Sequence, residues 1–110
     1  MPRPDQFTYN TRRHMSAYVI VQVRFNLGPE LAQYREHAVP AIQRYGGKFV
    51  VRGKEKALVE GEENGLDKVI MIEFPSLDDA RRWYESPEYA KALALSTKAM
   101  TRQLFIVESD

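Results

Sequence analysis

Two segments of the chain read as β-strands that carry apolar side chains on most of both faces. In residues 17–25, Val19, Val21 and Val23 share one face, and the other face is apolar at its start and polar at its end. Residues 67–74 carry apolar side chains on both faces. Strands that are apolar on both faces must be covered on both sides. These two segments are therefore predicted to be the central strands of a sheet.

Three other segments are predicted to be helices. The first begins at Pro29, a residue suited to a first turn, and ends before Gly46. Its apolar positions recur every three or four residues, at Leu31, Tyr34, Ala38, Ile42 and Tyr45. Ser76 is expected to cap a second helix, and Ser86 a third that runs to about residue 99.

The remaining strands are predicted on either side of the second and third helices. Residues 49–61 read as a strand that a bulge or bend interrupts at Gly53. Asn64 and Gly65 are the strongest signal for a hairpin turn, which would join this strand to residues 67–74. Residues 103–108 are predicted to be the last strand.

The resulting order is β-α-β-β-α-β with an extra helix before the last strand, the α+β arrangement called ferredoxin-like. It predicts a four-stranded antiparallel sheet with the first and third strands in the middle and the helices on one face. Something must then cover the other face, and a second copy of the chain is the economical answer. We expect a homodimer that pairs sheet to sheet. Residues 15–110 are predicted to form this single domain, and residues 1–14 a flexible arm.

Composition narrows the possible partners. The chain has no cysteine, which excludes disulfides, cysteine-bound zinc and a thiol nucleophile and fits a cytoplasmic location. The net charge of +1 is spread along the 110 residues, so neither nucleic acid nor a membrane surface is an expected partner. We expect no metal or cofactor, because no phosphate-binding loop or metal-ligand spacing is present. Residues 1–14 lack the apolar centre of a signal peptide.

Six ordered motifs resemble a known family. They are AYVIV at 17–21, YGGKF at 45–49, VRG at 51–53, EG at 60–61, IEFPS at 72–76 and WYESPEY at 83–89. Together they resemble domain of unknown function 1330, and the resemblance extends over residues 15–108. It implies a dimeric α/β barrel built from two ferredoxin-like units and implies no established activity. Members of this family commonly carry an arginine where this chain has Ser96, with Lys98 nearby. That difference points to a lost or altered anionic ligand.

Glu73 is the first candidate for chemistry. The predicted hairpin places the end of one strand beside the start of its neighbour, so Arg52 is expected to lie close to Glu73. One interpretation is a structural ion pair, because a partly buried carboxylate needs a cation or hydrogen-bond donors. The other is an acid/base group in a pocket.

His37 is the second candidate, as the one histidine in residues 15–110. A histidine can act as a general base or as a single axial ligand. The alternative is a partly exposed residue of the first helix, because no three-ligand metal set is visible in the spacing.

Five aromatic residues on the predicted helices form the third candidate group: Tyr34, Tyr45, Trp83, Tyr84 and Tyr89. They are interpreted either as core residues whose polar atoms find partners or as the wall of an apolar pocket edged by Arg52. Three functions remain open at this point. The first is a homodimer that binds a small apolar or aromatic molecule between helices and sheet. The second is a cofactor-independent enzyme, resembling small monooxygenases or isomerases, that acts on an aromatic or acyl substrate. The third is a purely structural interaction module.

Overall fold

The computed structural model describes residues 15–110, and the predicted arm at residues 1–14 lies outside them. The elements in order are β1 (Ala17–Phe25), α2 (Pro29–Arg44), β2 (Lys48–Glu55), β3 (Lys68–Phe74), α3 (Leu77–Glu85), α4 (Pro87–Ala99) and β4 (Met100–Glu108). This is the predicted α+β, ferredoxin-like arrangement with an additional helix before the last strand.

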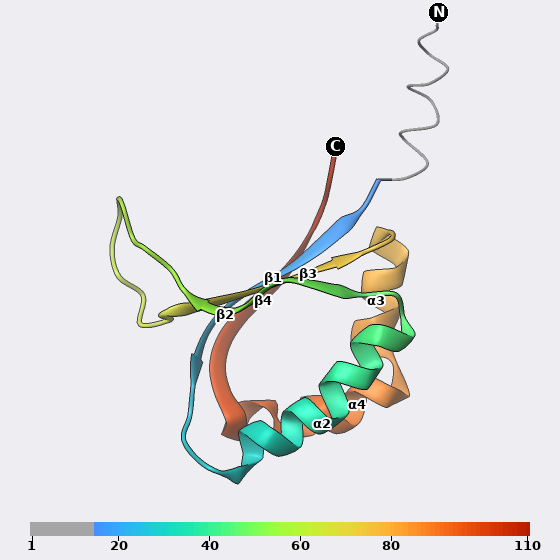
Figure 1. The fold of residues 1–110 in the computed structure, drawn as a ribbon, viewed down its shortest axis with the longest axis horizontal. Coiled ribbons are helices and arrows are strands. Elements are labelled where there is room, and N and C mark those ends of the chain that lie inside the picture. Colours follow the sequence, from blue (N-terminus) through green and yellow to red (C-terminus); the bar gives the residue numbers. More distant parts are fainter. Residues whose placement is uncertain (1–14) are drawn as a thin grey trace, which may run out of the picture.

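The four strands form one antiparallel sheet in the order β2-β3-β1-β4. β1 and β3 are therefore central, as their two-sided apolar patterns predicted. Val19 of β1 is opposite Ile72 of β3 and Ile106 of β4. The three helices lie on one side of the sheet (Figure 1). None of the helices in residues 15–110 is long and apolar enough to cross a membrane.

The core lies between the helices and the sheet. Its largest fully buried side chains include Trp83 of α3, Tyr89 of α4 and Phe74 of β3. The ring of Trp83 lies between the other two, with centroid distances of 5.4 Å to Phe74 and 4.4 Å to Tyr89. Such aromatic contacts add to the stabilisation that burial alone provides. This cluster fixes α3 and α4 against the centre of the sheet.

The predicted helix boundaries are confirmed by their hydrogen bonds. The Ser76 hydroxyl oxygen accepts from the backbone N–H of Asp79 at 3.0 Å, and the Ser86 hydroxyl oxygen accepts from that of Tyr89 at the same distance. Both satisfy a backbone donor that a helix start leaves free. Gly46 follows the end of α2 with a φ of +85°, a conformation that favours glycine.

Two predicted strand boundaries are wrong. β2 ends at Glu55 rather than at residue 61, and residues 56–67 form a long connection instead of a tight hairpin. Leu58 and Val59 in this connection are exposed, so their apolar pattern is not matched by burial. Asn64 does shape the chain, because its side-chain oxygen accepts from the backbone N–H of Leu66 at 3.0 Å. β4 starts at Met100 rather than at residue 103, since pairing with β1 extends to Phe25 opposite Met100.

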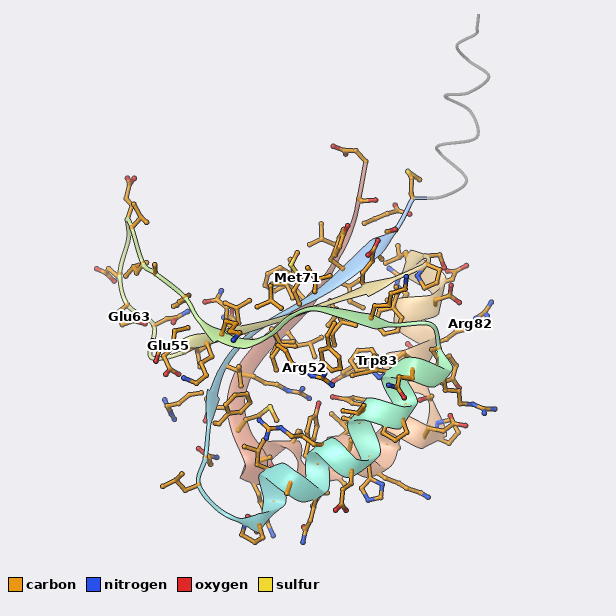
Figure 2. All side chains as sticks on the ribbon, in the orientation of Figure 1. Arg52, Glu55, Glu63, Met71, Arg82 and Trp83 are labelled. Atoms are coloured by element: carbon orange, nitrogen blue, oxygen red, sulfur yellow. The ribbon has the colours of Figure 1, made fainter. Side chains whose placement is uncertain are left out.

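The sheet face away from the helices is rich in apolar side chains. Ile20 of β1 is opposite Met71 of β3 and Phe105 of β4, and Figure 2 shows Met71 on this face. Phe105 is 41% exposed and Val107 is 45% exposed in the single chain. We call this surface the open face.

Candidate functional site

A cavity of about 110 Å³ lies between α2 and the sheet. Its lining is mostly apolar and includes Val21, Phe25, Leu31, Ala38, Val39, Ile42, Phe49, Ile70, Ile72, Met100 and Leu104. For scale, an engineered apolar cavity of about 150 Å³ binds benzene. The space therefore suits the buried part of a ligand no larger than a single ring or a short acyl chain.

Every charged residue that lines this cavity is an arginine: Arg35 of α2, Arg52 of β2 and Arg102 of β4. Arg35 and Arg52 are exposed, which places them at the mouth. Each lies over an aromatic ring, with Arg52 Cζ 4.0 Å from the centroid of Phe49 and Arg35 Cζ 5.3 Å from that of Phe25. These cation–π contacts hold two guanidinium groups beside the opening. Figure 2 shows Arg52 on the helix side of the sheet.

Arg102 lies deeper and joins two tyrosines. Its Nη1 donates to the hydroxyl oxygen of Tyr34 at 3.1 Å, and its Nη2 donates to that of Tyr89 at 3.0 Å. The two hydroxyl oxygens are 2.7 Å apart. Three elements meet here, since Tyr34 belongs to α2, Tyr89 to α4 and Arg102 to β4. We call these three residues the Arg–Tyr cluster.

Burial determines the charge of the Arg–Tyr cluster. It raises the pKa of Tyr89, and interaction with Tyr34 raises that pKa further, so the Tyr89 hydroxyl is protonated at neutral pH. Burial lowers the pKa of Arg102, but its interactions with Tyr34 and Tyr89 outweigh this effect and the net pKa is raised. The cluster therefore contains one cation and no compensating carboxylate.

Trp83 lines the same cavity from α3, and Figure 2 shows its side chain between sheet and helices. It is 1% exposed, and its indole Nε1 has no hydrogen-bond partner within the described part of the chain. A buried donor without an acceptor is uncommon and costs free energy. Trp83, a residue of the cavity wall, thus has a hydrogen-bond donor that the described part of the chain does not use.

Three of the predicted ligand-binding residues, Arg52, Tyr34 and Trp83, line this cavity. Tyr89 is not part of the lining and is linked to it only through its hydrogen bonds with Arg102 and Tyr34. The role of the predicted residues in binding stays a prediction. Trp83 and Tyr89 are core residues, as one of the two interpretations of the aromatic group held, and the interpretation as the wall of a ligand pocket stays a prediction.

Tyr45 and Tyr84 are absent from the lining of this cavity. The Tyr45 hydroxyl donates to Glu88 Oε1 at 3.0 Å, a contact that links the end of α2 to the start of α4. Tyr84 is 37% exposed and packs against Trp83, with ring centroids 5.9 Å apart. Their predicted part in ligand binding therefore gains no support from the cavity.

The predicted proximity of Arg52 and Glu73 is wrong. Glu73 is opposite Lys48, and Arg52 is opposite Ile70. The pairing shifts between Phe49 and Val51, and such a bulge moves the following side chains to the other face of a strand. Arg52 consequently faces the helices, whereas Glu73 belongs to the open face with its neighbour Tyr18.

His37 is exposed on α2. It borders a shallow hollow with Glu36, Arg44, Glu88 and Lys91, away from the residues that line the cavity. The acid/base roles predicted for His37 and Glu73 stay predictions, and neither residue is among those that line the cavity. Ser96, where the family resemblance led us to expect an arginine in relatives, is buried and donates its hydroxyl to the backbone oxygen of Leu93 at 2.8 Å.

Arg35 and Arg102 line the cavity, and neither was among the predicted site residues. Arg102 lies before the predicted start of the last strand, so no face was assigned to it. The signal was present, since Met100, Arg102, Leu104 and Ile106 alternate along β4 and all face the helices. Starting the predicted last strand at residue 100 instead of residue 103 would have continued its two-residue alternation and placed Arg102 on the face toward the helices.

The comparisons with known proteins concern family and fold. The family model described as domain of unknown function (DUF1330) matches residues 16–110. A solved protein of unknown function from Rhodopseudomonas palustris is similar in structure, with a TM-score of 0.66 at 21% identity, and the match covers 97% of this chain and 93% of that one. No curated protein matches the chain in sequence.

Other solved structures share the fold at lower identity. SnoaB, a cofactor-independent oxygenase from Streptomyces nogalater, has a TM-score of 0.56 at 11% identity, with 87% of this chain and 94% of that one covered. A putative antibiotic biosynthesis monooxygenase from Nitrosomonas europaea has a TM-score of 0.50 at 13% identity, with 86% and 88% covered. At these identities the likeness concerns the fold alone.

Proposed function

The chain belongs to the DUF1330 family, and we propose that its cavity binds a small one-ring aromatic or short acyl compound with an anionic oxygen group. One observation carries this proposal: an apolar cavity has three arginines and no acidic residue among the described residues that line it. Uncompensated guanidinium groups favour a carboxylate, which arginine can bind through two parallel hydrogen bonds. The apolar wall would hold the rest of the ligand.

The three arginines contribute unequally to such binding. Arg35 and Arg52 are exposed, so their attraction is weakened by water and screened by salt. Arg102 lies in a less polar environment, where the same charge acts more strongly. We therefore expect the outer pair to raise the rate of ligand capture and Arg102 to contribute more of the affinity.

The test compares two ring compounds of opposite charge. Benzoate is expected to raise the melting temperature of the protein and benzylammonium to leave it unchanged, because only the native cavity binds the anion. Arg102→Gln should weaken benzoate binding about tenfold, which corresponds to roughly 1.4 kcal/mol. Arg82→Gln is the matched control, since Arg82 is exposed on α3 near Asp79. Equal binding of both compounds, or equal losses in the two variants, would contradict the proposal.

The same cavity supports a second candidate, a cofactor-independent reaction on a small aromatic or acyl substrate. The observation in its favour is that the Arg–Tyr cluster offers buried donors, which can stabilise an oxyanion that develops during reaction. Any turnover should then survive Glu73→Gln and His37→Ala, because both residues lie outside the cavity lining. Loss of turnover in either variant would indicate that the substituted residue, Glu73 or His37, acts as an acid/base group after all. If no small molecule binds, the third function, an interaction module, gains support.

We also propose that two copies of the chain associate through their open faces. The partly exposed apolar side chains of the open face, among them Met71 and Phe105, support this arrangement. Burying them against an identical face would release apolar surface from water.

A further inference from the structure

We propose that the Tyr34 hydroxyl donates a hydrogen bond into the cavity and thereby selects ligands whose buried end carries a carbonyl-type oxygen. This inference rests on the proposed function and makes it more specific. It assigns the chemical class of the buried ligand group and names the residue that recognises it.

The argument starts from Tyr89. A tyrosine hydroxyl has one proton to donate and two lone pairs that accept. The Tyr89 oxygen already accepts from Arg102 at 3.0 Å. Its residue is 0% exposed, so its proton requires an acceptor inside the protein. The Tyr34 oxygen, at 2.7 Å, is the acceptor that the structure provides. Tyr89 therefore donates to Tyr34.

The direction of that hydrogen bond determines what Tyr34 can do. Its oxygen accepts from Tyr89 at 2.7 Å and from Arg102 at 3.1 Å, which occupies both lone pairs. Its own proton must then point away from both donors. Tyr34 lines the cavity, and the described residues give its proton no hydrogen-bond acceptor. The cavity is the remaining direction for this proton.

Arg102 makes Tyr34 a stronger donor. A cation that donates to a hydroxyl oxygen draws electron density from it, and hydrogen bonds in a chain strengthen one another. Burial raises the pKa of Tyr89, so Tyr89 keeps its proton and the direction of the chain is constant around neutral pH. The result is a charge-assisted donor at the wall of an apolar space.

This donor discriminates between ligands. A ketone, aldehyde, ester or carboxylate oxygen at the buried end accepts a hydrogen bond from the Tyr34 hydroxyl. A ligand with a methylene or an ammonium group there leaves that donor without a partner. Sites built around a buried donor reject ligands that lack the matching acceptor, because the unpaired group costs free energy.

The experiment uses two neutral probes of nearly equal shape, acetophenone and α-methylstyrene. In α-methylstyrene a =CH2 group replaces the carbonyl oxygen of acetophenone. Their dissociation constants are measured by calorimetry for the unmodified protein and for Tyr34→Phe. The affinity for acetophenone relative to α-methylstyrene should fall about tenfold in Tyr34→Phe. Tyr84→Phe is the control, because it removes the same hydroxyl from a residue outside the cavity lining, and it should leave the ratio unchanged.

The outcomes separate this inference from the function on which it rests. If α-methylstyrene binds Tyr34→Phe as tightly as it binds the unmodified protein, the cavity is intact and only the hydroxyl is being tested. An unchanged ratio would then overturn the inference and leave the binding function in place. Tighter acetophenone binding in Tyr89→Phe would also overturn it, because that result requires Tyr34 to donate to Tyr89. Failure of the unmodified protein to bind benzoate or either neutral probe would instead overturn the binding function.

Discussion

At the scale of single residues, what surrounds a charged side chain decides its role in this protein. Arg52 lies over Phe49 at the cavity mouth, whereas Arg102 is fixed inside by two tyrosine hydroxyls. The planar guanidinium group of Arg102 reaches both hydroxyls at once, which a lysine ammonium cannot reproduce with the same geometry. Glu88, at the start of α4, shows the same principle for a carboxylate on the surface.

We expect Glu88→Gln to lower the melting temperature at neutral pH. The hydrogen bond with its own backbone N–H and the one from Tyr45 lower the pKa of Glu88, and Arg44 Nε lies 3.1 Å from its carboxylate. A lowered carboxyl pKa means that the folded protein holds the proton less tightly than the unfolded chain. The stabilisation is therefore complete at neutral pH and is lost as the pH falls through the ionisation range of glutamate.

Thermal unfolding followed by circular dichroism over this pH range measures the effect. The difference between the two proteins should shrink toward zero in acid. Glu85→Gln is the control, because it removes the same charge at the end of α3, where the helix dipole does not favour an anion. A difference that stays constant with pH would show that the carboxylate is not the cause.

Sequence reasoning found Arg52 as a cavity residue but gave it the wrong neighbour. The residue type and the strand were right, yet the bulge between Phe49 and Val51 changed the face on which Arg52 lies. A one-residue shift of this kind leaves little trace in an apolar pattern, because both faces of these strands carry apolar residues. The contact between Arg102 and Tyr34, which are 68 positions apart, depends instead on the pairing of β4 with β1 and on the position of α2 over the sheet.

At the scale of elements, the chain after α2 passes close to β3 at a position where the sequence has a glycine. Gly47 follows α2, is buried, and donates its backbone N–H to the Ile42 oxygen at 2.9 Å. A Cβ atom at Gly47 would lie 2.6 Å from Ile42 Cγ2 and 2.8 Å from Phe74 Cζ. The chain can pass between α2 and β3 only because this position has no side chain.

We therefore expect Gly47→Ala to destabilise the protein by about 1–3 kcal/mol, the usual cost of forcing extra volume into a packed core. Phe74 is fully buried and cannot swing away from the added methyl group. Urea unfolding should show a lower midpoint with an unchanged slope. An unchanged midpoint would indicate that the end of α2 can shift at little cost, contrary to the packing described above.

Elements with strong local signals were predicted well, and elements defined by their partners were not. β1 and the caps of α3 and α4 follow from apolar alternation and from Ser76 and Ser86, so the sequence contained what was needed. The end of β2 depends on where β3 stops pairing with it. The start of β4 depends on the length of β1. The end of β2 is not encoded in its own segment, whereas the alternation from Met100 to Ile106 does extend to the start of β4.

At the scale of the whole molecule, the three helices cover one side of the sheet and leave the open face without a layer (Figure 1). The central strands are apolar on both sides, which led the sequence reasoning to expect a second covering layer. Ile20 and Met71 are only partly buried in the single chain. A layer on each face is the usual requirement for such strands.

We expect the unmodified protein to sediment as a homodimer at micromolar concentration and Phe105→Glu to sediment as a monomer. Phe105 lies on the open face opposite Ile20 and is 41% exposed in the single chain. A glutamate there would place an unpaired charge from each copy in the shared interface, where desolvation makes it costly. Leu27→Glu is the control, because Leu27 is fully exposed in the loop between β1 and α2, away from the open face. A monomeric unmodified protein, or a dimer that survives Phe105→Glu, would show that association does not use the open face around Phe105.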